Sequence, residues 1–581
     1  MSVRKSSRIA IGLDERAIVH SHRQYKGGTE MKKWLSLFVV ALFVLVLSAC
    51  TATKDAGEAP STEKEGDKGE TGTETEATPT EKVLYLNNGN EPTSFDPSVG
   101  FDAVSWNALN NLMEGLVRLS KDHLAEPATA EKIDVSDDGL TYTFTIREDA
   151  KWSNGDPVLA SDFVYGWLHM LNPETASPAA FLAYFIEGAE AYNSGTGTAD
   201  AVAIKAVQDK VFEVKLTTPT EAFLNIITNP SFFPVNEKVA TENPTWFADA
   251  ETFVGNGPFK LVDWKHDVSF TFAKNENYWD ASAVKLDKVE WAMINDSNTE
   301  YQMYQTGELD TSAVPSELAE SLMNSPELKN EDQAGLYFYR FNVSMEPFTN
   351  KKIRQAFAYA VNQQEMVDFV TKNGEKPAEG FVPYGFIGPD GKEFRETAGK
   401  LVGFDADKAK ALLAEGMKEE GYTVLPEVTL TYSTSDTHKK IAEALQSKFK
   451  EVLDVDVALQ NVEASVFATE QKEFKYQLSR SSFLFDYADP VNALESFITG
   501  SSMNRTTWSN AEYDKLITDI KNETDQSKRW EMLIEADALL MEEMPVFPIH
   551  YYNQVTLEKP SVSDIVRHPV GYLDLKWADK N

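Results

Sequence analysis

Residues 141–171 read TYTFTIREDAKWSNGDPVLASDFVYGWLHML, and this stretch decides the fold class. Tyr142, Phe144 and Ile146 alternate with threonines, which predicts a half-buried β-strand. Turn-forming residues follow at 151–157, and helical periodicity then marks 160–171. A strand, a turn and a helix in this order are typical of α/β architecture.

The same two patterns continue on both sides of this stretch. We expect further strands at 82–88, 211–217, 257–264, 269–275, 288–294, 336–343, 427–433, 455–462 and 476–483. Helical periodicity also marks 105–117, 297–306, 350–372, 405–420, 436–453, 509–522 and 527–543. No internal repeat and no break in composition occurs between 81 and 581, which favours domains joined by several chain crossings over domains strung on linkers.

Composition excludes several classes of function. Of the 581 residues, 42% are hydrophobic, which is enough for sizeable cores, and the formal net charge is −36. Such an acidic chain lacks the basic footprint that nucleic-acid binding needs. Cys50 is the single cysteine, so intramolecular disulfides and Cys-rich metal sites are excluded. No HExxH pair is present, and we expect neither a metal site nor a cofactor.

Residues 31–50, MKKWLSLFVVALFVLVLSAC, have the pattern of a secretory signal peptide. Two lysines precede an uncharged apolar run of fourteen residues, which is short of the roughly twenty that span a bilayer. The ending Leu-Ser-Ala-Cys resembles a bacterial lipobox, which implies cleavage before Cys50 and lipidation of its sulfur. The alternative is a chance cysteine after an ordinary signal peptide.

The segments on either side of the signal are not counted as part of the folded body. Residues 1–30 precede a complete signal and are interpreted as an upstream extension. Residues 51–80 lack large apolar side chains, so they cannot bury a core and are predicted to be a disordered tether.

Eight blocks, in order, then carry a family resemblance. They are NNGNEPTSFDP (87–97), NLMEGLVRL (111–119), the segment 138–173, GNGPFKLVDW (255–264), NENYWD (275–280), PFTNKKIRQAFAYAVN (347–362), YSTSDTHKKIAEALQ (432–446) and DYADP (486–490). In these blocks the chain resembles extracellular solute-binding proteins of the peptide and nickel class, specifically the oligopeptide-binding component of an ABC importer. The resemblance covers essentially all of 81–581.

The resemblance implies an α/β, two-lobed fold of the periplasmic-binding-protein type, with three domains and a hinge between the lobes. Domain I would comprise 81–104, 244–335 and 553–581, domain II 105–243 and domain III 336–552. The chain would cross between lobes near 336–341 and 548–556. The implied partners are an oligopeptide and the permease subunits of an ABC transporter, and we expect a monomer. With the lipid anchor, its place would be the outer face of the cytoplasmic membrane, and the long polar tether suits a Gram-positive cell surface.

A receptor for many peptides must recognise what all peptides share. An exposed strand edge can pair with backbone amides, and a buried carboxylate can bind an α-ammonium. The resemblance implies that Asp486 binds the ammonium and that the strand segment Ser482, Phe483 and Leu484 pairs with the peptide as an added strand. The alternative is that Asp486 merely starts a solvated turn, the role to which we assign Asp489.

The peptide carboxylate requires cations at the other end of the site. Arg480 stands at an even spacing from Asp486, which would place both on one face of a strand. His438 follows Ser435, a plausible N-cap, so it would lie in the first turn of a helix, where anions are favoured. The resemblance places Arg480 and His438 near the carboxylate of short peptides; a surface ion pair and an exposed histidine are the alternatives.

Three residues near the start of the body, Asn90, Glu91 and Thr93, match the family's other ligand-pairing segment. An ordinary exit from a strand into a loop would account for them equally. Tyr184 falls where the family has a cleft tyrosine, although core packing is an equal alternative.

Other ligands and functions stay open. Ala464 and Gln471 stand where well-known family members carry a tryptophan and a basic residue, so the side-chain pockets and the preferred peptide length are not specified. Within the same fold, a signalling peptide, a dipeptide, a nickel complex or haem are alternatives. A surface peptidase is a distant one, because no Ser-His-Asp signature, GxSxG elbow or zinc motif is visible, and we expect a binding protein rather than an enzyme. An adhesin or chaperone role would leave the same sequence.

Overall fold

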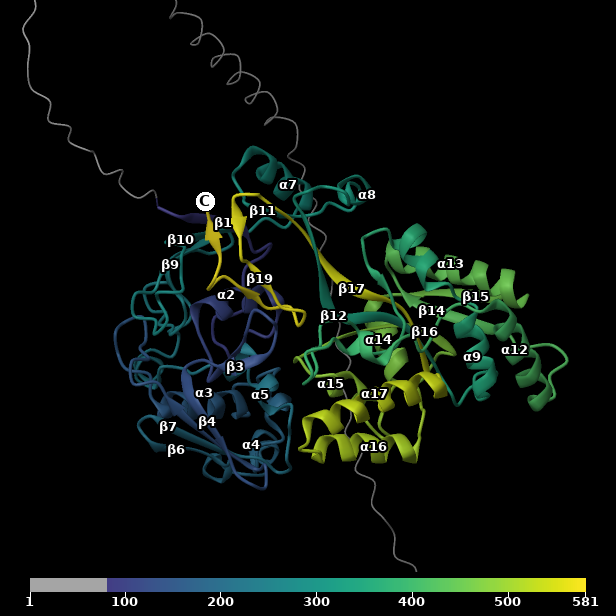
Figure 1. The fold of residues 1–581 in the computed structure, drawn as a ribbon, viewed down its shortest axis with the longest axis horizontal. Helices are drawn as coiled ribbons and strands as arrows, with labels where there is room; N and C mark the ends of the chain where they lie inside the picture. Colours follow the sequence, from purple (N-terminus) through teal and green to yellow (C-terminus); the bar gives the residue numbers. More distant parts are fainter. Residues whose placement is uncertain (1–80) are drawn as a thin grey trace, which may run out of the picture. The chain divides into compact units, whose positions relative to one another are not determined.

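A computed structural model describes residues 81–581 (Figure 1). The expected signal peptide, Cys50 and the tether at 51–80 therefore lie outside the described residues. The described part groups as one compact unit, so the division into three domains stays a prediction. It holds three larger β-sheets, each with helices packed against it.

The first sheet joins the start of the described chain to a much later segment. Its order is β1 (Val83–Asn87), β10 (Lys288–Ala292), β9 (Ser269–Lys274) and β8 (Phe259–Lys265). β1 pairs parallel with β10, and the other pairs are antiparallel. All four strands were predicted, and their alternating buried side chains, such as Phe270 and Phe272, form the core under this sheet.

The second sheet contains the strand that decided the fold class. Its order is β4 (Ala130–Val135), β5 (Thr141–Ile146), β7 (Val211–Lys215) and β6 (Ile204–Gln208). The predicted burial of Tyr142, Phe144 and Ile146 is confirmed, and α3 (Ala160–Leu171) covers the predicted helix and packs on β6 and β7. The expected helix at 105–117 is shorter, because α2 (Ala103–Leu112) ends where extended backbone at Met113 leads into β2 (Val117–Leu119), which pairs with β3 (Ala125–Pro127).

The third sheet is mixed. Its order is β11 (Thr311–Ala313), β17 (Val546–Glu558), β12 (Leu328–Phe341), β16 (Leu478–Leu484), β14 (Val428–Ser433) and β15 (Val457–Val462), with β13 (Lys376–Pro377) on β17. β14 is parallel to both β15 and β16, whereas the other pairs are antiparallel.

Two long strands, β12 and β17, contain both predicted chain crossings. They run side by side (Figure 1), from the pair Leu328–Leu557 to the pair Arg340–Val546. Their register is interrupted between Asp332 and Leu336 and again one pair further on. β12 begins well before the predicted strand at 336–343, and β17 was not predicted as a strand.

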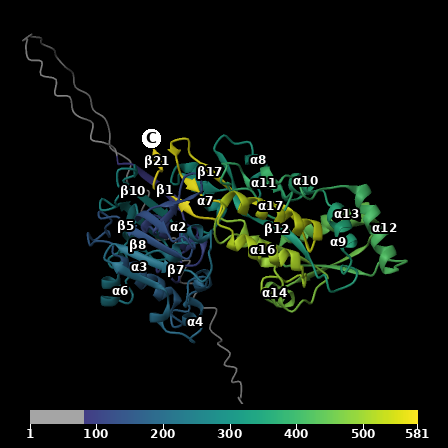
Figure 2. The ribbon, with the colours of Figure 1, turned by 60° about the horizontal axis from the view of Figure 1, so that its bottom comes forward.

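The longer helices agree closely with the predicted ranges. They are α7 (Ser297–Thr306), α12 (Ala406–Glu420), α13 (Asp436–Leu453), α16 (Ala511–Asn522) and α17 (Gln526–Glu543). α16 and α17 pack against each other and lie side by side in Figure 2. The expected helix at 350–372 is divided into α9 (Lys351–Tyr359), α10 (Gln363–Glu365) and a π-helical turn at 366–371, because the Asn362 side chain accepts the Glu365 N–H and caps a new start.

Short elements complete the described chain. The short helices are α4 (Ala189–Asn193), α5 (Phe223–Ile226), α6 (Glu237–Glu242), α8 (Ala319–Leu322), α11 (Phe394–Ala398), α14 (Ala464–Lys472) and α15 (Val491–Leu494). The C-terminal strands are β18 (Val562–Ser563), β19 (Val566–Arg567), β20 (Leu573–Asp574) and β21 (Asp579–Lys580).

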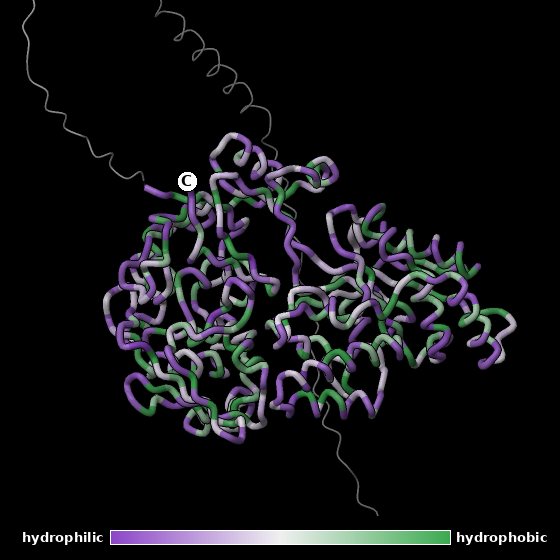
Figure 3. The backbone as a smooth tube through the Cα atoms, viewed as in Figure 1, coloured by the Kyte–Doolittle hydropathy of each residue, from purple (hydrophilic) through white to green (hydrophobic). Residues whose placement is uncertain are grey.

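Short hydrophobic and hydrophilic stretches alternate along the described backbone (Figure 3). Among residues 81–581, none of the helices has both the length and the apolar character that crossing a bilayer requires.

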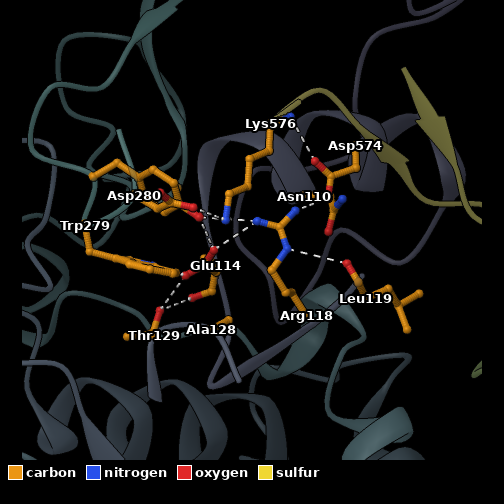
Figure 4. Close-up of polar contacts among 12 residues, drawn as sticks. Asn110, Glu114, Arg118, Leu119, Ala128, Thr129, Trp279, Asp280, Asp574 and Lys576 are labelled. Carbon is orange, nitrogen blue, oxygen red and sulfur yellow. Dashed lines mark hydrogen bonds and ion pairs between the residues drawn. The ribbon is translucent and has the colours of Figure 1, made fainter. Parts of the chain in front are cut away.

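A buried ion network joins the C-terminal segment to β2 and to the connection between β9 and β10 (Figure 4). Arg118 lies between Glu114 and Asp574. Its Nη1 is 3.3 Å from Glu114 Oε2, and its Nη2 contacts Asp574 Oδ2. Lys576 extends the network to Asp280 with an N–O distance of 2.8 Å. Although burial opposes ionisation, the Arg118 charge holds the pKa of the Asp574 carboxyl at about 2. The Asp574 carboxyl is therefore charged at neutral pH.

Candidate functional site

One edge of β16 is open over half its length. β16 pairs with β12 from Leu478 to Leu484, but with β14 only at Leu478 and Ser479. From Arg480 onward, the edge that faces away from β12 has no strand partner within residues 81–581.

The alternation of main-chain hydrogen bonds along β16 shows which N–H and C=O groups face the open edge. Phe485 N–H donates to Ala334 O at 3.0 Å, beyond one end of the ladder between β16 and β12. Antiparallel residues alternate in the direction of their hydrogen-bonding groups, so odd-numbered residues of β16 face β12. The main-chain groups of Ser482 and Leu484 therefore face the open edge.

Gln471 closes the edge at its other end. Its Nε2 donates to Arg480 O at 2.7 Å and to Ser479 Oγ at 2.8 Å. Well-known family members carry a basic residue at this position. Here the glutamine side chain hydrogen-bonds a main-chain carbonyl on the edge of β16. The open segment is therefore bounded by Gln471 on one side and by Asp486 on the other.

Asp486 follows the end of β16 and is half-buried. Its N–H donates to Asn492 Oδ1 at 2.9 Å, and its carbonyl accepts a hydrogen bond from the Tyr572 hydroxyl at 3.2 Å. Tyr572 Oη in turn accepts from Asn229 Nδ2 at 3.0 Å, so segments far apart in sequence meet at this point. Burial raises the pKa of the Asp486 carboxyl, and the nearby Glu495 charge adds to this. The carboxylate forms no ion pair within residues 81–581.

The neighbouring Asp489 has a different role. Both of its carboxylate oxygens accept from the Arg529 guanidinium on α17 at 2.9 Å, and the two side chains are almost fully buried. Asp489 does lie in a turn, as expected, but it is also half of a buried ion pair. Of two aspartates three residues apart, only Asp486 retains a free charge.

Arg480 and His438 come together through a shared tyrosine. The Arg480 guanidinium lies 5.0 Å from the centroid of the Tyr337 ring, and Tyr337 Oη lies 3.2 Å from His438 Nδ1. His438 is in the first turn of α13, after the N-cap Ser435, as predicted. Burial, together with the Arg480 charge, lowers the pKa of His438 to about 4. At neutral pH the imidazole is uncharged, so Arg480 supplies the positive charge of this pair.

The remaining predicted residues form local contacts elsewhere. Glu91 accepts from His266 Nδ1 at 2.7 Å and from Asp267 N–H at 2.9 Å. Thr93 N–H donates to a serine hydroxyl on α2, and Asn90 is exposed.

Tyr184 is likewise engaged locally, because its hydroxyl donates to Asn193 Oδ1 at 2.7 Å. Within the described chain, no hydrogen bond or ion pair joins Asn90, Glu91, Thr93 or Tyr184 to β16 or to Asp486. Their role as ligand contacts stays a prediction.

A cavity of about 260 Å³ lies beside the open segment. Its lining combines aromatic rings, including Phe338, Phe467 and Phe483, with three arginines, Arg340, Arg480 and Arg505. Sequence reasoning found Phe483 and Arg480 but missed Arg340 and Arg505. A signal for Arg340 was present, since it is the one charged residue in the apolar strand segment LYFYRFNV (336–343).

Comparison with known proteins identifies the family of this chain. Residues 125–505 match the model of "Bacterial extracellular solute-binding proteins, family 5 Middle". The chain belongs to this family. Extracellular solute-binding proteins of the peptide-binding type serve ABC importers outside the cytoplasm.

Individual family members show the same likeness. The dipeptide-binding protein DppE of Bacillus subtilis is 58% identical over 535 residues, which cover 92% of this chain and 96% of the relative. The unliganded open form of MppA, a periplasmic murein tripeptide binding protein, has a TM-score of 0.77 at 28% identity, covering 86% of this chain and 97% of MppA. Listeria monocytogenes OppA bound to peptide has a TM-score of 0.66 at 31% identity, with coverage of 86% and 99%.

These relatives are binding proteins of transport systems, and the fold is the multidomain α/β fold of the peptide-binding family members. Among the described residues, no group of three or more His, Cys, Asp or Glu side chains is placed to hold a metal ion.

Proposed function

We propose that this chain is a lipid-anchored, extracytoplasmic receptor that binds oligopeptides along the open edge of β16 and delivers them to the permease of an ABC importer. The single observation that carries the proposal is an unpaired strand edge that ends at a half-buried carboxylate without a cationic partner among residues 81–581. Main-chain groups of Ser482 and Leu484 pair with the peptide backbone, and Asp486 binds its α-ammonium.

The opposite end of the peptide meets Arg480. A carboxylate there lies against a guanidinium that has no acidic partner in the described chain, with Tyr337 and the neutral His438 beside it. A peptide carboxylate next to His438 would raise the pKa of its imidazole. Binding of such a peptide below neutral pH is therefore accompanied by uptake of a proton.

The comparisons support capture by closure of the protein around its ligand. The TM-score is higher against an unliganded open form than against a peptide-bound relative, 0.77 against 0.66. A structure that resembles an open form suits a receptor that rotates shut around its ligand, and both predicted chain crossings fall within the paired strands β12 and β17.

A dipeptide receptor is the second candidate, because the relative with 58% identity is named as dipeptide-binding. Calorimetry with dialanine, trialanine, tetraalanine and pentaalanine separates the two candidates. An oligopeptide receptor binds trialanine or the longer peptides more tightly than dialanine, whereas a dipeptide receptor shows the reverse order. Failure of all these free peptides to bind, together with metal-dependent thermal stabilisation, would replace peptides by a metal complex as the ligand.

The anchor and the transport role have their own tests. Mass spectrometry of the mature protein should find a lipid-modified N-terminal cysteine at Cys50, and Cys50→Ser should release the protein from cells. Size-exclusion chromatography with light scattering should give a monomer. Intact recovery of the peptide after incubation distinguishes the receptor from a surface peptidase.

A further inference from the structure

Arg340 is a buried charge without a counter-charge. It lies on β12, its side chain is only 8% exposed, and its Nη2 donates to the Ser481 hydroxyl. Its Nε is buried without a hydrogen-bond partner, and the same is true of the Nε atoms of Arg480 and Arg505 in the same cavity. None of the three arginines forms an ion pair with a carboxylate of the described chain.

The other buried arginines between residues 81 and 581 have acceptors that offset their charge, although the Nε atoms of Arg395 and Arg529 also lack a hydrogen-bond partner. Arg118, Arg395, Arg529 and Arg567 pair with carboxylates, and Arg354 donates to main-chain carbonyls. Removing an unpaired charge from water is costly. Burial lowers the pKa of Arg340 to about 10, and the charges of Arg505 and Arg480 act in the same direction. The cavity therefore has an excess of positive charge that nothing in the described chain balances.

The arginines divide between the two faces of the third sheet. Residues that are paired across the ladder share a face, and the faces alternate along each strand. Ser481 pairs with Phe338, so Arg340 lies on their face, and the hydrogen bond from Arg340 to Ser481 agrees with this. Arg480 is on the opposite face, against Tyr337. The open edge of β16 therefore has a cationic group on each side.

A peptide added to this edge sends alternate side chains to the two faces. Its carboxyl end is already assigned to the face of Arg480 and His438. A side chain on the other face would point toward Arg340 and Arg505, in the cavity of about 260 Å³ that Arg480 also lines. Arg340 is almost fully buried at this cavity, and burial strengthens any ion pair formed there.

We propose that the cavity at Arg340 and Arg505 binds a carboxylate on a side chain of the peptide, so that this receptor prefers acidic peptides. This inference rests on the proposed function and deepens it. The preferred ligand then brings three charged groups to one strand edge: an ammonium at Asp486, a terminal carboxylate at Arg480 and an acidic side chain between them.

The test is calorimetry of the purified protein with Ala-Ala-Ala and with peptides that carry Glu or Gln at each position in turn. At one position, Glu should bind about 30-fold more tightly than Gln, the value of a charge-assisted hydrogen bond of roughly 2 kcal/mol. Arg505→Gln should remove most of this preference while Ala-Ala-Ala still binds. Arg505 is only half-buried and lies outside any regular element, so this variant should fold even if the buried Arg340→Gln does not.

Matched controls separate the outcomes. Arg147→Gln changes an arginine that stacks on Trp279, with its guanidinium 3.7 Å from the ring centroid, and it should keep the full preference for Glu. Binding of Ala-Ala-Ala with no preference for Glu over Gln at any position overturns the acidic subsite and leaves the receptor function intact. Failure of every peptide to bind overturns both.

Inorganic phosphate and acetate, each alone, are the probes for a general anion site. Recognition of a peptide side chain would be overturned if either anion raised the melting temperature as much as the Glu peptide does and if Arg505→Gln abolished both increases. Absence of such an effect, together with the preference for Glu, supports it.

Discussion

Replacing Asp486 by asparagine tests the centre of the proposed mechanism. The substitution removes a negative charge and keeps nearly the same shape, and the main-chain contacts of Asp486 with Asn492 and Tyr572 do not require its carboxylate. We therefore expect the variant to fold normally and to lose affinity for peptides with a free N-terminus.

The expected loss follows from the burial of the carboxylate. A hydrogen bond to a charged group contributes about 1.5–3 kcal/mol, and breaking a fully desolvated charge pair costs roughly 2–5 kcal/mol. Asp486 is half-buried, which places the loss at about 2–3 kcal/mol, or about 30- to 150-fold in Kd. Because burial raises the pKa of Asp486, the affinity of the native protein should already fall in acid above the carboxyl's ordinary pKa.

A double-mutant cycle measured by calorimetry isolates the interaction. Ala-Ala-Ala and its N-acetylated form are titrated into the native protein and into Asp486→Asn. Acetylation should weaken native binding by the same factor as the substitution, and it should have little further effect on the variant. Equal losses on acetylation in both proteins would mean that the ammonium binds elsewhere, and the reasoning would be refuted.

Glu495→Gln is the matched control for the local negative potential. Glu495 lies near Asp486 but is engaged by the Tyr487 hydroxyl at 3.2 Å and by Lys521 at 2.8 Å. Its removal should change the peptide Kd by no more than about threefold, as expected for a charge that is partly exposed and already paired. A loss as large as that of Asp486→Asn would show that the general potential, rather than a specific pair, attracts the ammonium.

Further predictions concern stability and pH. Asp489→Ala leaves the buried Arg529 without its partner and should lower the free energy of unfolding by about 3–5 kcal/mol in urea titrations; a change below about 1 kcal/mol would contradict the buried pair. The pKa of Asp574 is depressed to about 2 beside Arg118, so the stability that it contributes is present above its ordinary pKa of 3.8 and should be lost as the pH falls from there to about 2. Acid denaturation of Asp574→Asn should lack that part of the transition. The pKa of His438 is lowered to about 4, so the unfolded chain binds its proton more readily, and stability should rise with pH from about 4 to 6.5. His438→Asn should flatten this rise, and an unchanged slope would contradict the neutral buried imidazole.

Most helices and strands whose apolar residues recur with a clear helical or alternating period were predicted from the sequence. α13 coincides with the predicted range 436–453, and β16 with 476–483 to within two residues. β17 was missed because VFPIHYYNQVTLE contains a proline, which argues against a central strand. The first half of β12 was missed because LKNEDQAG has no apolar alternation, and only its pairing with β17 makes it a strand.

The candidate site was predicted unevenly for related reasons. Asp486 and Arg480 follow from a family pattern and a strand signal. Whether a charged side chain is unpaired, however, depends on partners that are distant in sequence. Arg505 and Asp489 illustrate this, since one lacks a partner within the described chain and the other has Arg529 on a helix 40 positions later.

The ribbon of β12 and β17 has a mechanical consequence for ligand sensing. The register between these two strands shifts between Asp332 and Leu336 and again after Tyr337. β16 pairs with β12 beginning at Gly335. The irregular part of the ladder and the strand proposed to bind the peptide are thus neighbours in one sheet. A peptide paired with the far edge of β16 would lie one strand away from β12, so its binding can act on this irregular part of the ladder through main-chain hydrogen bonds alone.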